Sequence, residues 1–457
     1  MSPSPAEREA PPSLLALSPL LLFIALFCGV GFTLIASGEA NAFYRLPAAV
    51  ALVPALALGL WLAHRRGAPA FDRLLGGMGD KDVQLMLLIF LLSGAFTAVS
   101  RATGGVEAVV ALGLSVIPAA LILPGIFLLA TAIALALGTS MGTIAAVAPI
   151  ALGLADAASL DKALVLGAVL SGATCGDNLS VISDTAIAAA RTQGTTMRAK
   201  FLENLKFAVP AALGTLVLLA FAGDAQPVPP ADPPSAWLAL PYLAVLVLAV
   251  LGVNVLAVLA IGVVLAGAFG LAFADYGVLG FTGDVHQGFL SVTDTVLVSL
   301  FVAGLGALIR ADGGFAWFVA RIEALARGRK GPRVGQLGIA GLVAGSDALL
   351  ANNTVAILLS GPIAKDIAAA HGVPPARSAS LLDIFACVTQ SLLPWGAQIL
   401  LAASLGGVSP LDLAGSLHYC WLLGGLTLAW VLFERPRAGW RASPTEAAAT
   451  APVPAKP

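Results

Sequence analysis

Residues 173–185 read Ala-Thr-Cys-Gly-Asp-Asn-Leu-Ser-Val-Ile-Ser-Asp-Thr, and they place two carboxylic acids, an amide and four hydroxyls inside an otherwise apolar stretch. A charged side chain at the centre of a membrane helix costs about 2.5 to 3.5 kcal/mol on insertion scales, so such residues face protein or a water-filled cavity. The stretch therefore predicts a functional site inside a membrane-embedded protein.

The composition of the whole chain supports a membrane protein. The chain has 457 residues, of which 59% are hydrophobic and 11% are charged, whereas soluble proteins have about 25% charged residues. Four isolated cysteines and four histidines indicate neither a disulfide framework nor a zinc site. The net charge of −1 favours no nucleic acid. We expect a non-enzymatic protein without a cofactor, whose partners are the lipid bilayer and a small ion or molecule; a homodimer is compatible with these features.

Apolar segments of membrane-spanning length predict about ten transmembrane helices. They cover residues 17–36, 46–63, 83–100, 164–190, 205–222, 237–251, 253–272, 292–309, 378–403 and 411–432. Two further apolar stretches, 119–154 and 337–367, are too long for one crossing, and each has a polar break near its middle. Each of them is therefore either two spans or one re-entrant hairpin.

The distribution of basic residues favours two re-entrant hairpins. Lys and Arg cluster around residues 65–81, 191–206, 327–333 and 435–441, which predicts that these segments are cytoplasmic. Residues 155–161 and 223–235 contain acids but no Lys or Arg, so they should lie outside. If both stretches are re-entrant hairpins, all of these assignments hold together. We then expect a protein of the bacterial inner membrane with both termini on the cytoplasmic side.

Two motifs recur in order along the chain. Arg101-Ala-Thr-Gly-Gly105 recurs as Arg310-Ala-Asp-Gly-Gly314, and Ala148-Pro-Ile-Ala151 recurs as Gly361-Pro-Ile-Ala364, the second pair at an offset of 213 residues. By the charge distribution Arg101 lies outside and Arg310 inside, so the two halves insert in opposite orientations. Inverted repeats with paired breaks are typical of secondary transporters, whose sites lie where discontinuous helices meet.

The predicted fold is an all-α polytopic membrane protein with inverted repeats, two re-entrant hairpins and broken helices. Its parts are a cytoplasmic segment (1–16), two N-terminal transmembrane helices (17–70), repeat A (71–191) with hairpin 119–154 and broken helix 164–190, connecting helices (192–280), inverted repeat B (281–406) with hairpin 337–367 and broken helix 378–403, a C-terminal transmembrane helix (407–434) and a disordered cytoplasmic tail (435–457).

The polar residues at the breaks supply carboxylate, amide and hydroxyl oxygens, which are the ligands that a hard cation such as Na+ prefers. The predicted ion- or proton-binding residues are Asp177, Asn178, Ser180, Ser183, Asp184 and Asp347, with Asp177 and Asn178 as the Na+ ligands. The residues predicted to contact substrate or to form hairpin tips are Thr139, Ser140, Thr143, Asn352, Asn353, Thr354, Gln390 and Ser391. Burial favours the protonated form of a carboxylic acid and a bound cation favours the carboxylate, so one Asp can exchange H+ for Na+.

Structural roles compete with ion binding at several positions. Ser183 or Asp184 can cap the helix that follows, because Ser and Asp are favoured N-cap residues. Asn352-Asn353 can be the turn of a hairpin without any ligand. Asp347 can face a polar vestibule.

Other carboxylates allow other functions. Asp383 is interpreted as a partner of Arg377 near the membrane surface. Asp177 and Asp347 could form the dyad of an intramembrane aspartyl protease, but their Thr-Cys-Gly-Asp and Gly-Ser-Asp contexts differ from the Gly-x-Gly-Asp and Tyr-Asp contexts of such enzymes. A channel is a further class, although paired broken helices suit a gated midplane site better than a continuous pore.

Gly176-Asp-Asn-Leu-Ser-Val-Ile-Ser-Asp-Thr185 closely resembles the signature of the NhaC-type Na+/H+ antiporter family of the ion transporter superfamily. The similarity extends from Gly138-Thr-Ser-Met-Gly-Thr143 to Pro394-Trp-Gly396. This resemblance implies an inverted-repeat fold and Na+/H+ antiport by alternating access. The chain departs from the family pattern where Val181 replaces a proline and Ala186 a threonine. Because relatives of this family include sodium-coupled carboxylate exchangers and amino acid permeases, a Na+- or H+-coupled transporter of an organic solute is the alternative.

Overall fold

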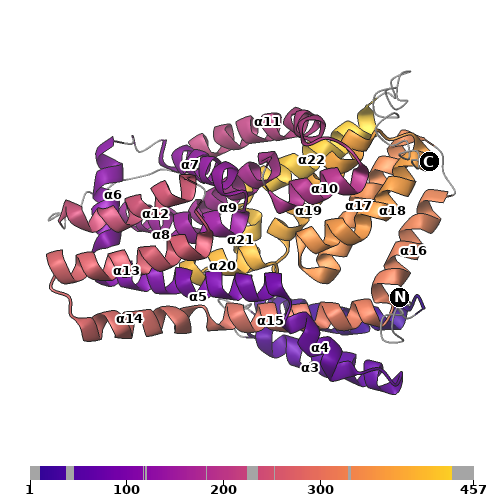
Figure 1. Cartoon of the computed structure of the whole chain (residues 1–457), viewed down its shortest axis with the longest axis horizontal. Helices are drawn as coiled ribbons and strands as arrows, with labels where there is room; N and C mark the ends of the chain where they lie inside the picture. The colour runs from indigo at the N-terminus through magenta and orange to yellow at the C-terminus, as the bar shows by residue number, and fades with distance from the viewer. Residues whose placement is uncertain are drawn as a thin grey trace, which may run out of the picture.

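The computed structural model describes residues 11–37, 46–116, 118, 121–181, 183–223, 235–251, 253–327 and 331–434, and every regular element in these ranges is a helix (Figure 1). The predicted disordered tail (435–457), the first ten residues and most of the acidic loop (224–234) lie outside the described residues.

The helices follow one another along the chain with short connections. Their bounds are α1 Ser18–Ala36, α3 Ala48–Arg65, α4 Ala70–Met78, α5 Lys81–Ala102, α6 Gly105–Val116, α7 Ile122–Leu137, α8 Ser140–Ala157, α9 Lys162–Leu179, α10 Asp184–Gln193, α11 Met197–Phe221, α12 Leu240–Val250, α13 Val255–Phe273, α14 Val278–Ser291, α15 Thr293–Ala311, α16 Gly314–Arg327, α17 Pro332–Leu350, α18 Asn353–His371, α19 Pro375–Leu392, α20 Ala397–Gly406, α21 Pro410–Gly415 and α22 His418–Phe433.

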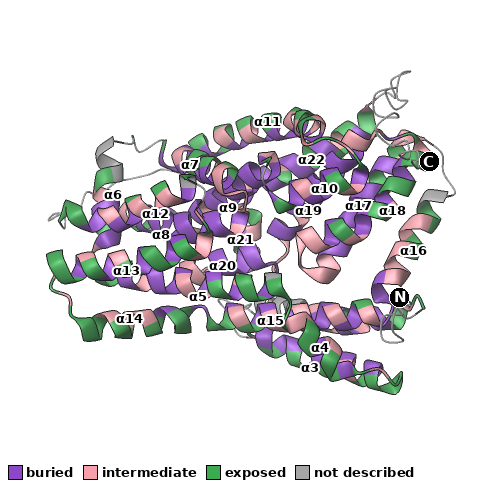
Figure 2. Ribbon diagram, in the orientation of Figure 1, coloured by how far each residue is buried: buried purple, intermediate pink, exposed green. Residues whose placement is uncertain are grey.

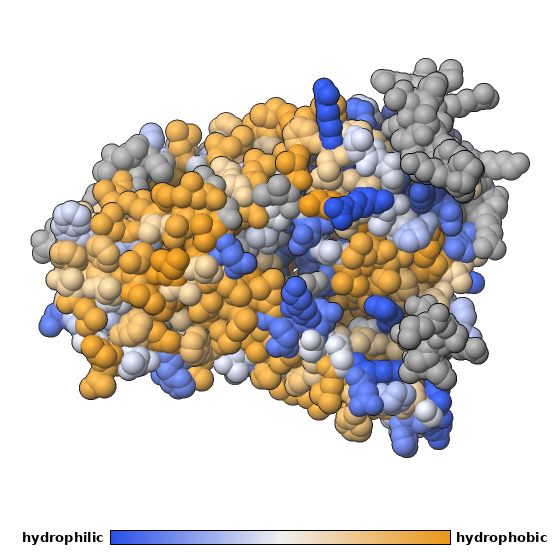
Figure 3. Space-filling view, viewed as in Figure 1, coloured by the Kyte–Doolittle hydropathy of each residue, from blue (hydrophilic) through white to orange (hydrophobic). Residues whose placement is uncertain are grey.

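Among the described residues, eight segments are long and apolar enough to cross a membrane, and shorter apolar helices accompany them. Two of the eight, Lys162–Gln193 and Pro375–Gly406, are the predicted broken helices, each interrupted between two helical pieces. Apolar side chains cover most of the visible surface, and hydrophilic ones gather toward the right of the view (Figure 3). The prediction of an all-α polytopic membrane protein is confirmed.

Each stretch predicted as a re-entrant hairpin forms two consecutive helices, α7 and α8 in the first and α17 and α18 in the second. α7 ends at Gly138, which adopts a left-handed conformation with φ of 65°, and α8 begins two residues later. α17 ends at Ala351, whose φ of 50° is also left-handed. That conformation costs a residue with a Cβ atom about 1 to 2 kcal/mol, whereas glycine adopts it readily. The second hairpin tip is therefore a strained turn.

The 213-residue offset found in the sequence reappears in the helix bounds. It maps α9 onto α19 and α10 onto α20 at both ends, it maps the end of α7 onto the end of α17, and it maps the start of α8 onto the start of α18. In Figure 1 the hairpin α7–α8 lies left of the centre and the hairpin α17–α18 lies to the right. The two halves thus repeat one arrangement of hairpin and broken helix.

The helix α8 and the two broken helices are the most buried of the long apolar segments (Figure 2). The 18-residue windows are 83% buried in α8, 88% in α9–α10 and 78% in α19–α20, compared with 33% in α11 and 39% in α13. α9 approaches α7 closely because glycines face it: a Cβ at Gly172 would lie 2.3 Å from the carbonyl oxygen of Phe127, and one at Gly176 would lie 2.3 Å from that of Thr131. The polar breaks of α9 and α19 are therefore held inside protein.

Candidate functional site

A cavity of about 180 Å³ lies where the hairpin tips meet the two breaks. Both tips contribute to its wall, through Thr139 on one side and Ala351 to Thr354 on the other. Asp184 comes from the first break, and Gln390, Trp395 and Gln398 come from the second. The four polar breaks that the sequence predicts to converge thus meet at one cavity.

Asp177 lies in the last turn of α9, directly before the break, and is not one of the residues that line the cavity. Its side chain is 4% exposed, and its Oδ1 accepts a hydrogen bond of 2.6 Å from the Ser183 hydroxyl. Ser140, at the start of α8, also interacts with the Asp177 side chain. The carboxylate is therefore held by hydroxyls from the break and from the hairpin tip.

Neither Ser183 nor Asp184 caps the helix α10 with its side chain. Ser183 occupies the N-cap position of α10 but makes no side-chain cap, because its hydroxyl is directed to Asp177 and also lies 2.9 Å from the Thr185 hydroxyl. Asp184 lies in the first turn of α10, is exposed and forms part of the cavity wall. The two acids of the motif thus have different surroundings, one buried and one facing the cavity.

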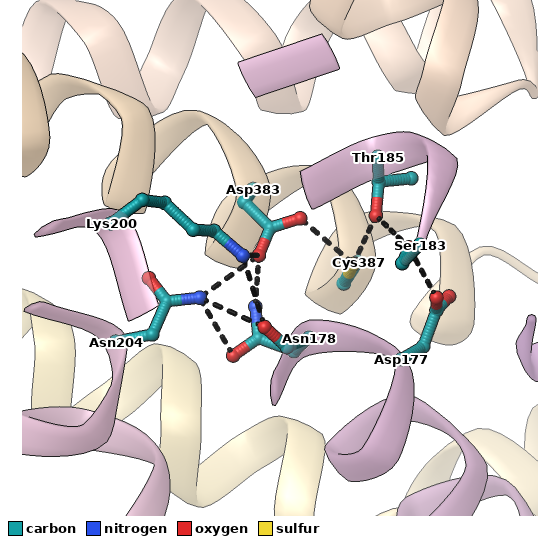
Figure 4. A network of polar contacts seen from close by, with 8 residues as sticks. All are labelled: Asp177, Asn178, Ser183, Thr185, Lys200, Asn204, Asp383 and Cys387. Carbon is teal, nitrogen blue, oxygen red and sulfur yellow. Dashed lines mark hydrogen bonds and ion pairs between the residues drawn. The ribbon is translucent and has the colours of Figure 1, made fainter. Parts of the chain in front are cut away.

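Asn178 belongs to a second polar cluster, drawn together with Asp177 in Figure 4. Its side-chain Nδ2 donates a hydrogen bond of 2.8 Å to Asp383 Oδ2, and its backbone carbonyl oxygen accepts one of 3.0 Å from Lys200 Nζ. Lys200 forms an ion pair with Asp383, and Asn204 Nδ2 lies 2.9 Å from the same carboxylate oxygen. All four side chains are at most 1% exposed. We refer to these four residues as the Lys200 cluster.

This cluster corrects the interpretation of Asp383 as a partner of Arg377. Arg377 instead binds Glu203 and Glu434, with N–O distances of 3.0 and 2.7 Å. The two residues lie six positions apart on α19, so they point to different sides of the helix and are separated by about 9 Å along its axis. The predicted pair is wrong for that reason.

Lys200 and Asn204 are site residues that sequence reasoning missed. From its sequence neighbours Lys200 is expected only to be one of the basic residues of a cytoplasmic loop. The signal that could have revealed it is the spacing of four, which places Lys200 and Asn204 on the same face of α11 as the buried Phe207, Ala208 and Ala211.

Asp347 is completely buried, so the alternative in which it faces a polar vestibule is wrong. Neither of its carboxylate oxygens has a hydrogen-bond partner among the described residues. The neighbouring Ser346 hydroxyl accepts a hydrogen bond of 2.8 Å from Ser360, across the hairpin. In the described part of the chain no hydrogen bond or ion pair joins Asp347 to Asp177, so the structure does not form the dyad of an aspartyl protease.

A chain of hydrogen bonds crosses from the second break to the first hairpin. Thr174 and Ser391 are 2.8 Å apart, and Ser391 donates to Gln398 Oε1 at 3.0 Å. Gln398 Nε2 then donates to the Ser140 hydroxyl. Gln398 therefore links Ser391 to Ser140, and this chain connects the two halves.

The remaining tip residues make local contacts. Asn352 caps α18 by accepting a hydrogen bond of 3.0 Å from the Val355 amide, and Asn353 accepts one of 2.9 Å from the Thr354 amide. The turn-forming alternative for Asn352-Asn353 therefore agrees with the structure, although both residues and Thr354 also line the cavity. Gln390 donates to the Ala351 carbonyl at 3.2 Å and thereby ties the second break to this tip.

Two predicted residues bind backbone beside the first tip. The Thr143 hydroxyl donates to the Thr139 carbonyl at 2.9 Å, and the Ser180 hydroxyl donates to the Leu135 carbonyl at 3.3 Å. No group of three or more His, Cys, Asp or Glu side chains suited to a metal ion occurs in the described ranges. Asp177 has hydroxyl oxygens around it, which are of the kind that hard cations prefer.

Comparison with known protein families finds a match over part of the chain. Residues 77–223 match the model of the Na+/H+ antiporter family. This range includes the first hairpin, both acids of the motif and Lys200, so the resemblance predicted from the sequence is confirmed there.

Two individual proteins are also similar to the chain. The malate-2H(+)/Na(+)-lactate antiporter of Bacillus subtilis (strain 168) is 31% identical over 215 residues, which are 45% of this chain and 44% of that relative. The chain thus matches less than half the length of this curated relative. The crystal structure of the Alcanivorax borkumensis YdaH transporter aligns with a TM-score of 0.41 and 12% identity over 92% of this chain and 99% of that one.

Proposed function

We propose that the chain is a secondary antiporter that exchanges Na+ for H+ by alternating access, with Asp177 as the shared site. The observation that carries this proposal is the position of Asp177, a carboxylate that is 4% exposed, lies beside the break of α9 and is bound by the Ser183 hydroxyl. The match to the Na+/H+ antiporter family over residues 77–223 supports it.

The surroundings of Asp177 allow H+ and Na+ to compete. A buried carboxylate is costly when it is uncompensated, so it favours either a proton or a cation. Hydroxyl oxygens of Ser183 and Ser140 next to it can complete an oxygen ligand set for Na+. Binding of one ion then requires release of the other, which couples the two fluxes.

The cavity provides the route to this carboxylate. Among the described residues that line it, Asp184 is the one ionisable group, and Lys and Arg do not occur. A wall of this kind attracts cations rather than repelling them. Because both hairpin tips and both breaks form the wall, a relative shift of the two halves would open the cavity to one side of the membrane at a time.

Exchange of an organic carboxylate is a second candidate, and one feature of the cavity favours it. The helices α8, α10, α18 and α20 all begin at the cavity wall. The partial positive charge of helix N-termini attracts carboxylates. The Bacillus subtilis relative is named as an antiporter of malate and lactate.

Purified protein in liposomes that contain a pH-sensitive dye distinguishes the two candidates. Sodium is added outside without any organic anion, and then with malate or lactate inside or outside. The Na+/H+ antiporter predicts an immediate pH change with sodium alone, a smaller one with potassium, and no requirement for either carboxylate. A pH change that needs malate or lactate would instead support the carboxylate exchanger.

A further inference from the structure

The ammonium group of Lys200 occupies a position surrounded by oxygen atoms in the interior of the molecule. Nζ forms an ion pair with Asp383 Oδ2 and donates a hydrogen bond of 3.0 Å to the Asn178 carbonyl (Figure 4). The Asn178 carbonyl lies at the C-terminal end of α9, where backbone oxygens lack helical partners and carry partial negative charge. The site thus combines a carboxylate with a helix-end carbonyl.

Asn204 faces Asp383 with its amide nitrogen, not with its oxygen (Figure 4). Its Nδ2 contacts Asp383 Oδ2, but its Oδ1 is buried and has no hydrogen-bond partner among the described residues. The two oxygens that bind the ammonium, a carboxylate of Asp383 and the backbone carbonyl of Asn178, are of the kinds that a hard cation such as Na+ takes in proteins.

We propose that the Lys200 cluster is a monovalent-cation site whose resident cation is the tethered ammonium of Lys200. The ammonium ion keeps Na+ out of this site, so that Asp383 does not take part in ion binding in the wild-type chain. Removal of the ammonium leaves Asp383 buried without a counter-charge, and Na+ binds there in its place.

The Lys200 cluster joins three helices, α9, α11 and α19, which belong to different parts of the chain. Asn178 comes from the broken helix of repeat A, Asp383 from that of repeat B, and Lys200 and Asn204 from α11. A bound cation at this junction holds the two repeats and α11 together. A tethered cation does so at every ion concentration, whereas a free ion would not.

This site is separate from the one at Asp177, although a path of weak contacts joins them. Asp383 Oδ1 is 3.9 Å from the Cys387 sulfur, which is 3.9 Å from the Thr185 hydroxyl, and Thr185 contacts Ser183. The direct partners of the two carboxylates differ: Asp177 binds Ser183, whereas Asp383 binds Lys200 and Asn178. The inference does not depend on Asp177 being the transport site.

Equilibrium binding of radioactive sodium to the purified full-length protein in lipid nanodiscs tests the proposal. We compare the wild type with Lys200→Ala, with Lys200→Arg, which keeps the charge, and with Lys200→Ala/Asp383→Asn, which removes both charges. Lys200→Ala should bind one further sodium ion per chain than the wild type. Lys200→Arg and the double variant should not gain this ion.

Thermal unfolding of the same proteins in sodium and in choline controls for folding. Lys200→Ala should lose stability in choline, because a buried carboxylate without its partner is strongly unfavourable, and should regain it in sodium. The sodium effect on the double variant should equal that on the wild type. A Lys200→Ala protein that remains unfolded at every sodium concentration would contradict the site.

Two binding outcomes would also overturn the proposal. They are equal sodium stoichiometry in the wild type and in folded Lys200→Ala, and an additional ion that persists in the double variant. Adding Asp177→Asn to Lys200→Ala separates this proposal from the antiport site, since the additional ion should remain while any ion at Asp177 is lost.

Discussion

Ser183 determines how easily Asp177 carries a negative charge. Its hydroxyl donates the 2.6 Å hydrogen bond to Oδ1, and a hydrogen bond to a charged group contributes about 1.5 to 3 kcal/mol. Ser183→Ala should therefore raise the sodium concentration at half-maximal antiport by about tenfold or more, because each 1.4 kcal/mol corresponds to a factor of ten. Sodium titration of the rate in proteoliposomes measures this.

A matched control for that variant is Ser360→Ala. Ser360 is also a completely buried serine, but its hydroxyl binds Ser346 inside the second hairpin. We expect its sodium dependence to match that of the wild type. Equal shifts in the two variants would mean that loss of any buried hydroxyl, rather than the bond to Asp177, causes the effect.

At the scale of helices, close packing of α9 on α7 fixes the position of Asp177. A Cβ at Gly176 would lie 2.3 Å from the Thr131 carbonyl oxygen and 2.5 Å from the Ala134 Cβ, so Gly176→Ala must push α9 away from α7. We expect a loss of about 1 to 3 kcal/mol in stability, as for other overpacked sites, and impaired antiport. Thermal unfolding and proteoliposome assays measure the two effects.

Gly125→Ala is the control for this substitution, since Gly125 lies in α7 and has open space around its Cβ position. Alanine favours a helix over glycine by about 1 kcal/mol, so this variant should be as stable as the wild type or more stable. Similar losses in Gly125→Ala and Gly176→Ala would show that helix contact is not the cause.

Arg377 connects four helical elements through one buried guanidinium group. Arg377 lies in α19. It binds Glu203 in α11, Gln336 in α17 and Glu434 at the C-terminal end of α22. Arg377→Ala should lower stability by about 3 to 5 kcal/mol, because removal of one member of a buried ion pair leaves uncompensated charge. The thermal unfolding midpoint of the purified variant measures the loss.

Lys206→Ala provides the comparison, because Lys206 pairs with the same Glu203 but is half exposed. An exposed pair contributes about 0 to 1 kcal/mol, so its midpoint should hardly change. Loss of the same size in both variants would contradict the assigned role of the buried network.

At the scale of the whole molecule, the two halves should insert in opposite orientations. Arg101 lies in the last turn of α5 and Arg310 in the last turn of α15, and both residues are exposed. In a background without the four native cysteines, Arg101→Cys should react with a membrane-impermeant maleimide on intact cells, and Arg310→Cys only after permeabilisation. Labelling of both from the same side would refute inverted repeats.

Much of this architecture could be predicted from sequence because it depends on local features. The lengths of the apolar segments predict the helices. The polar breaks at Gly138 and Asn352 predict the hairpin tips, where the chain turns. The Lys200 cluster could not be predicted, because its contacts join residues 178, 200 and 383, which no local pattern relates. The spacing of Lys200 and Asn204 places both on the buried face of α11, but it does not indicate that they meet Asn178 and Asp383 there.

The most direct test of the central claim is proton movement driven by sodium in liposomes that contain either the wild type or Asp177→Asn. Asp156→Asn, at an exposed position paired with Lys162, is the matched control. The proposed exchange predicts sodium-driven proton movement in the wild type and in the control, and none above empty liposomes in Asp177→Asn, provided that this variant is folded. Wild-type rates in folded Asp177→Asn would contradict the account.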